Sequence, residues 1–89
     1  MNRTKINIEA NKKLKETFFN KEIRSCEARL EGCQGNMFLT LAHRHKRRWY
    51  YGQEDLLSDF NQVILACVNC HSKMEYNKEL TETIFERQR

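Results

Sequence analysis

The chain of 89 residues contains no proline and only three glycines. No Gly/Ser-rich linker and no internal repeat interrupts it. No segment therefore has the composition of a linker between domains. The sequence predicts a single domain that covers residues 1–89.

Long apolar runs are also missing. The first residues, MNRTKINIEANKK, contain no apolar stretch of signal-peptide length, and no later segment is apolar enough to span a bilayer. We therefore expect no membrane partner and a protein that stays in a reducing cytoplasm. Disulfides do not persist there, so metal binding is the expected role of the cysteines.

Apolar residues are scarce, at 39% of the chain, and aromatic residues make up 10%. A short chain with so thin a core usually needs a metal ion or disulfides to hold its fold. Its four cysteines form two pairs, Cys26 with Cys33 and Cys67 with Cys70. Two such pairs commonly bind tetrahedral zinc, whereas a thioredoxin-like role for the second pair lacks the βαβ pattern it requires. The sequence predicts one structural Zn²⁺ held by all four cysteines.

Two segments have the periodicity of amphipathic helices. Residues 8–20 predict an N-terminal helix, and residues from about 78 to 88 predict a C-terminal one. The apolar residues at helical spacing are Ile8, Leu14, Phe18 and Phe19 in the first segment and Leu80, Ile84 and Phe85 in the second.

The core of the domain is expected between these helices, over about residues 26–76. Residues 37–43 (MFLTLAH) predict a short strand, and residues 62–66 (QVILA) predict a second strand or the approach to Cys67. A helix is expected over about 68–76. Together these elements predict a small α+β domain.

The formal net charge is +4, and four thiolates with one Zn²⁺ would change it by −4 + 2 = −2. The global charge therefore says little about partners. Positive charge is concentrated in the run RHKRR, whose cations are Arg44, Lys46, Arg47 and Arg48. Such a run is typical either of a solvated surface or of a phosphate-binding segment.

The three histidines allow two interpretations. His43 and His45 lie two residues apart at the end of the first expected strand, a spacing that puts both on one face. His71 directly follows Cys70, but four cysteines complete a tetrahedral shell, so it is not expected to bind the same ion. It also precedes Glu75 by one helical turn. The histidines either form a second metal site or a general base beside one, or are surface residues near a basic turn.

The order of these motifs resembles a known family. A cysteine pair followed by LAHRHKRR and then by NQVILACVNCHSK is similar to the small phage and bacterial HNH endonucleases. Their ββα-metal core is built on a treble-clef zinc finger. The resemblance covers about residues 26–75, and its most specific part is His43-x3-Arg47 followed by Cys-x2-Cys-His. It implies a treble-clef zinc domain with helical extensions at both ends.

The resemblance also implies metal-dependent hydrolysis of DNA by a phage-encoded protein in the cytoplasm of a bacterial host. His43 matches the general base that activates water, and a neutral imidazole suits that task. His71 matches the helical ligand of a second divalent ion, which would be Mg²⁺, Mn²⁺, Ni²⁺ or Zn²⁺. The residues expected to hold DNA phosphates are Arg44, Lys46, Arg47 and Arg48.

Two positions depart from the family pattern. Ala42 stands where the family has a metal ligand, so His45 or Glu75 would have to replace it. Asn61, the match to the middle asparagine that orients the loop or the base, is displaced by one residue, and Gln62 occupies its expected place.

The alternative function follows from these departures. It is a catalytically inactive treble-clef zinc module that binds nucleic acid or a protein partner, for example a phage inhibitor of a host factor. The run WYY at residues 49–51 suits either function. Its rings are expected either to stack on bases or to pack at the rim of a small core.

Overall fold

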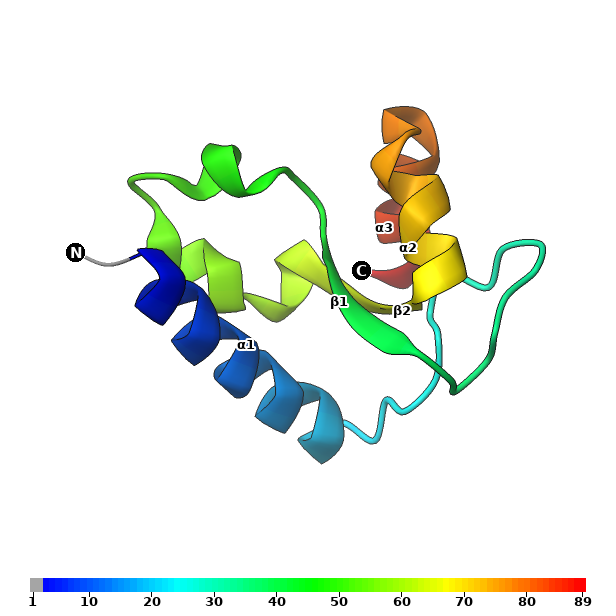
Figure 1. Ribbon diagram of the computed structural model, residues 1–89, viewed down its shortest axis with the longest axis horizontal. Helices are drawn as coiled ribbons and strands as arrows, with labels where there is room; N and C mark the ends of the chain where they lie inside the picture. Colours follow the sequence, from blue (N-terminus) through cyan, green and yellow to red (C-terminus); the bar gives the residue numbers. More distant parts are fainter. Residues whose placement is uncertain (1–2) are drawn as a thin grey trace.

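The computed structural model describes residues 3–89, which form a small mixed α/β domain (Figure 1). Helix α1 (Arg3–Asn20) is followed by strand β1 (Leu39–His43). Strand β2 (Val63–Cys67) runs directly into helix α2 (Val68–Glu75), and α3 (Lys78–Gln88) comes last. The predicted order of helix, strand, strand, helix and helix is confirmed.

Three short 3-10 helices connect the strands. They are η1 (Arg47–Tyr50), η2 (Glu54–Ser58) and η3 (Phe60–Gln62). Gly52, with φ of 84°, turns the chain between the first two. The strands themselves are antiparallel, with Leu39 opposite Cys67 and His43 opposite Val63.

Each face of this sheet is covered by helices. Leu41 and Val63 point to the face that packs on α1, where they meet Leu14 and Phe18. The opposite face lies against α2 and α3 (Figure 1). Its buried cluster is the larger one and includes three of the cysteines: Cys26, Ala28, Ala42, Ile64, Ala66, Cys67, Cys70, Met74, Ile84 and Phe85. The core on this side is therefore built around the cysteines.

Helix α1 was predicted in type, and its buried face matches the prediction in part. It begins at Arg3, and Ile8 and Phe19 are exposed by 63% and 65%. Leu14 and Phe18 are buried as expected, and with Ala10 they repeat every four residues along one stripe. Ala10 is small, so the spacing of the large apolar residues does not reveal its place on the stripe.

The other elements match the sequence more closely. The first strand begins at Leu39 rather than residue 37, and the second strand ends at Cys67. In the C-terminal helix Ile84 and Phe85 are buried as expected. None of the helices in the described part of the chain has the length and apolarity needed to cross a membrane.

A buried ion pair joins the C-terminal residue to the loop after α1. Arg89 donates two hydrogen bonds to the carboxylate of Glu27, at 2.7 and 2.9 Å, and the two side chains are only 7% and 10% exposed. The same guanidinium donates to the carbonyls of Phe60 and Val63 and lies 3.7 Å from the centre of the Phe60 ring. Arg89 thus ties α3 to the loop, to η3 and to β2.

Arg89→Ala is expected to lower the free energy of unfolding by about 3–5 kcal/mol, because it leaves the Glu27 carboxylate buried without its partner. Arg87→Ala is the control, since Arg87 is exposed and makes one hydrogen bond, to the carbonyl of Ala28. Chemical denaturation measures both variants. Equal losses in the two variants would contradict a special role for the buried pair.

Candidate metal centre and histidine site

The four cysteines gather into one cluster beside the start of α2. Their Sγ atoms all lie within 4.8 Å of one another, although they come from two segments far apart in the sequence. Cys26, Cys67 and Cys70 are buried, Cys33 is half-buried, and all four are free thiols. Within residues 3–89, no other three His, Cys, Asp or Glu side chains come close enough to share an ion.

Backbone geometry brings the sulfurs together and supplies donors to them. Cys67 ends β2, and its Sγ caps α2 by accepting the backbone N–H of Cys70 at 3.4 Å. From the loop, Gln34 N–H donates to Cys67 Sγ and Gly35 N–H donates to Cys33 Sγ, both at 3.4 Å. Hydrogen bonds of this kind are stronger when the acceptor is ionised, so the backbone is arranged for thiolates.

The loop is held against α2 by a close contact at Gly32. The side-chain amide of Asn69 donates to the Gly32 carbonyl at 2.7 Å. A Cβ on Gly32 would lie 2.6 Å from that amide nitrogen, and the φ of +80° also favours glycine. This glycine therefore sets the approach of the first cysteine pair to the second.

The thiols of the second pair differ in acidity. Burial opposes ionisation of Cys67, but the backbone N–H groups of Gln34 and Cys70 outweigh it and lower the pKa of Cys67 to about 6. Burial is the main cause that raises the pKa of Cys70, and the neighbouring thiols of Cys67 and Cys26 add to it. Without a cation the cluster thus resists full ionisation, whereas a bound metal ion would favour four thiolates.

The donor set fits a tetrahedral ion. Four thiolates bound at a Zn–S distance of about 2.3 Å would be separated by about 3.8 Å, which is compatible with sulfurs that all lie within 4.8 Å. Four sulfur ligands fill the shell and leave no open position, as in structural rather than catalytic sites. The cysteines could therefore hold a metal ion, in line with the sequence prediction.

His43 lies at the end of β1 with one ring nitrogen already engaged. Its Nε2 is 2.9 Å from the carbonyl oxygen of Leu57. A carbonyl only accepts hydrogen bonds, so Nε2 carries the proton and Nδ1 has the free lone pair. Burial is the main cause that lowers the pKa of His43 below 6.5, the hydrogen bond to Leu57 opposes this shift, and Arg47 and His71 lower the pKa further. The ring is thus neutral at pH 7 and fixed in one tautomer, as a general base requires.

His71 is held in the complementary tautomer on α2. Its Nδ1 lies 2.8 Å from Thr40 Oγ1, and this hydroxyl donates its own proton to the carbonyl of Ala66 at 2.7 Å. Nδ1 must therefore donate to Thr40, which leaves Nε2 with the lone pair. Nε2 points along the helix toward Glu75, 3.7 Å away. The expected shared face of His71 and Glu75 is confirmed.

His43 and His71 flank β1 rather than share one of its faces. Thr40 contacts α2, whereas His43, three residues later, packs its ring against Tyr50 with centroids 5.6 Å apart. The two histidines are still close enough for His71 to contribute to the lowered pKa of His43. His71 and Glu75 supply only two donors, and His45 does not complete a group of three with them. Among residues 3–89, the side chains therefore do not fit a second ion held by the protein alone.

Ala42 lies in the core, not at an open strand end. It is 1% exposed and packs in the same cluster as Ile64, the residue paired with it across the sheet. Ala42, which the resemblance to HNH endonucleases matches to a metal ligand, is therefore enclosed by apolar side chains.

Ala42→Asp is expected to lower the free energy of unfolding by more than about 2 kcal/mol, because the carboxylate would be buried without a partner. Ala42→Ser adds a smaller polar group at the same site and is expected to cost less. Thermal melts and calorimetric titration with Mg²⁺ or Mn²⁺ measure the outcome. An Ala42→Asp protein that melts like wild type and binds the ion more tightly would contradict this placement.

The basic run is divided by the structure. Arg44, expected to bind phosphate, instead forms an ion pair with Glu82 of α3, with hydrogen bonds of 2.6 and 3.2 Å. Lys46, Arg47 and Arg48 are exposed, and no acidic side chain within residues 3–89 pairs with them. These three are the cations available to a phosphate backbone.

No protein-family model matches the chain, and no curated protein or solved structure matches it either. The site is therefore interpreted from its own geometry.

Sequence reasoning missed the residue that orders the loop beside the histidines. Asn61 is exposed, and its backbone N–H binds Asp59. Its neighbour Gln62 makes the long-range bonds instead: its carbonyl accepts from the N–H of Arg44 at 2.8 Å, and its side chain accepts from the Tyr50 hydroxyl at 3.3 Å. The sequence held a signal for this role, because the resemblance expects the middle asparagine at the position of Gln62.

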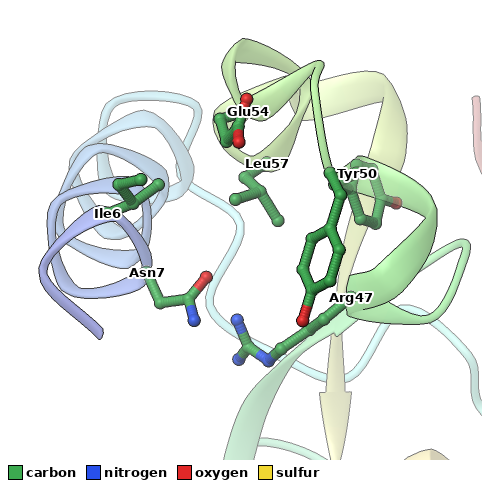
Figure 2. A pocket seen from close by; sticks show the side chains of 7 residues that line it. Ile6, Asn7, Arg47, Tyr50, Glu54 and Leu57 are labelled. Atoms are coloured by element: carbon green, nitrogen blue, oxygen red, sulfur yellow. The ribbon is translucent and has the colours of Figure 1, made fainter. Parts of the chain in front are cut away.

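A small pocket lies between α1 and the loop that carries η1 and η2. Figure 2 shows the Arg47 side chain reaching toward Asn7 across this pocket, with Tyr50 and Leu57 on its wall. Its volume of about 50 Å³ is far below the roughly 300–1,000 Å³ of sites for small organic ligands. Arg47 is thus placed at the rim of a pocket too small for a nucleotide.

Proposed function

We propose that the chain is a treble-clef zinc module of the HNH type that hydrolyses DNA phosphodiester bonds with His43 as general base. The observation that carries this proposal is the hydrogen bond from His43 Nε2 to the carbonyl of Leu57. It fixes the tautomer and frees Nδ1, and the lowered pKa of His43 keeps that nitrogen unprotonated at neutral pH.

The zinc would serve the fold. Held by four thiolates, it has no open position and would join the loop of Cys26 and Cys33 to the start of α2. The ββα unit of β1, β2 and α2 carries His43 and His71 on elements that meet at this junction. This order of parts supports the treble-clef assignment.

In the proposed reaction, His43 Nδ1 accepts a proton from the attacking water, whose oxygen bonds to phosphorus. The bond from phosphorus to the leaving sugar oxygen breaks, and solvent water protonates that oxygen. The exposed cations Lys46, Arg47 and Arg48, which follow β1 closely, bind the backbone phosphates without reading sequence. His71 Nε2 and Glu75 offer two donors to a divalent ion that DNA phosphates and water would have to complete.

The second candidate is a zinc module that binds nucleic acid or a protein without cleaving DNA. The specific observation in its favour is Ala42, enclosed by the core where the family has a ligand. Both candidates share the zinc site and the exposed cations, and they differ only in whether a water is activated.

Cleavage of supercoiled plasmid distinguishes them. Zinc-loaded protein is incubated with plasmid while Mg²⁺, Mn²⁺, Ni²⁺ or additional Zn²⁺ is supplied singly, and relaxed and linear forms are quantified on gels. The endonuclease proposal expects nicking with at least one ion. Binding of the plasmid in a gel-shift assay without nicking by any ion would favour the second candidate.

A further inference from the structure

The aromatic run at residues 49–51 separates into a buried anchor and two exposed rings. Tyr50 is completely buried, whereas Trp49 and Tyr51 are 44% and 53% exposed. The Tyr50 hydroxyl accepts from the backbone N–H of His45 and donates to the side chain of Gln62, both at 3.3 Å. Tyr50 therefore fixes the segment from which Trp49 projects.

Trp49 is held in one orientation by its neighbours. The His45 ring stacks on it with centroids 4.0 Å apart and planes 21° apart, and Tyr50 meets it edge-on at 5.1 Å and 82°. The backbone of Trp49 is also fixed, because its N–H donates to Lys46 and its carbonyl accepts from the Gln53 side chain. A ring supported on one face and along one edge, yet nearly half exposed, presents a flat surface to solvent.

Three cations directly precede this ring in the sequence. Lys46, Arg47 and Arg48 are exposed and form no ion pair within residues 3–89. Exposed aromatic rings beside unpaired cations form the binding surface for single-stranded nucleic acid, where bases stack on the ring and phosphates meet the charges. In a paired duplex both faces of every internal base are already stacked, so such a ring has no internal base to receive.

The same Tyr50 ring contacts His43, at 5.6 Å between centroids. Tyr50 thus lies between Trp49 and the proposed general base.

We propose that Trp49, backed by His45 and Tyr50, is a stacking platform that makes single-stranded or locally unpaired nucleic acid the preferred substrate class. This inference rests on the proposed action on nucleic acid and adds to it the form of strand that is bound. Charge complementarity favours nucleic acid over a protein partner, since the three residues directly before Trp49 are exposed cations that form no ion pair within residues 3–89.

Trp49 is the single tryptophan of the chain, so its own fluorescence reports the contact. Zinc-loaded full-length protein, without added divalent ion, is titrated with a short oligothymidine, with an abasic strand of the same length, and with the corresponding duplex. We expect the oligothymidine to quench Trp49 and the abasic strand, which has the same charge, to quench it far less. Equal quenching by both strands would overturn the platform.

Variants separate stacking from charge. Trp49→Ala is expected to weaken binding of labelled oligothymidine by about 5- to 100-fold and to leave duplex binding and the salt dependence nearly unchanged. Trp49→Phe should retain part of the affinity. The double variant of Arg47 and Arg48 to Ala should weaken both forms of DNA and flatten the salt dependence. Tyr76→Ala is the control, because Tyr76 is 87% exposed but lies in the turn after α2.

The outcomes distinguish this inference from the function on which it rests. If Trp49→Ala bound oligothymidine as tightly as the wild type, the platform would be overturned. The proposal that the protein cleaves plasmid would not be affected by that result. If Trp49→Ala lost self-association or contact with another protein but kept its DNA binding, Trp49 would belong to a protein interface. That result would overturn the platform. Quenching without cleavage by any ion would support the platform and reject the nuclease. No binding to any strand would reject both.

Discussion

Cys67→Ser is expected to abolish both metal binding and the cooperative unfolding transition. Cys67 is completely buried, ends β2, and belongs to the cluster that forms the core under α2 and α3. Serine retains an oxygen that can cap α2, so the change removes the thiolate ligand and little else. In small metal domains the free energy of metal binding is largely the free energy of folding, on the order of 10 kcal/mol for structural zinc. Circular dichroism melts and elemental analysis measure the two losses.

Ser72→Ala is the matched control, because Ser72 is exposed on the same helix. It should keep the wild-type metal content and melting temperature. A Cys67→Ser protein that melts cooperatively at the wild-type temperature would contradict a structural metal centre.

His43→Gln is expected to reduce plasmid cleavage at least about 100-fold, the usual contribution of a general base. Glutamine can still donate to the carbonyl of Leu57, so the loop should keep its position while the basic nitrogen is lost. Metal content and melting temperature should stay close to wild type. An activity loss accompanied by unfolding would instead place His43 in the scaffold.

The pH profile of the wild type gives an independent check of His43. Burial, Arg47 and His71 lower its pKa below 6.5, so the neutral base predominates above that value and is protonated as the pH falls through the lowered pKa. The acidic limb of single-turnover cleavage should therefore have its midpoint below pH 6.5. A midpoint above pH 6.5 would mean that another group is the base. Thr83→Ala, an exposed change on α3, is the control and is expected to keep the wild-type pH profile.

Local patterns predicted most of the elements and the gathering of the four cysteines. The Cys-x2-Cys spacing is a local property, and it places both sulfurs at the start of α2. Cys26 and Cys33 were assigned to the same site from ligand number, and the fold brings them there. The N- and C-terminal helices carried periodicity that is visible without tertiary contacts, whereas the second strand was left open.

Features that depend on distant partners were not predictable in this way. Arg44 belongs to a basic run in sequence, but Glu82, far along the chain, pairs with it. Arg89 gave no signal in the sequence, yet its pairing with Glu27 connects four segments.

The local surroundings of the histidine site were equally hidden. The tautomers of His43 and His71 are set by the Leu57 carbonyl and by Thr40, contacts that only the folded chain creates. The burial of Ala42 likewise follows from its register opposite Ile64.

The metal centre is the foundation of this account, and the metal content of the folded wild-type protein tests it most directly. Elemental analysis and native mass spectrometry of protein purified without added metal should give one zinc per chain, with all four thiols protected from alkylation until a chelator is added. Folded protein without metal, or with a disulfide between Cys67 and Cys70, would contradict the account.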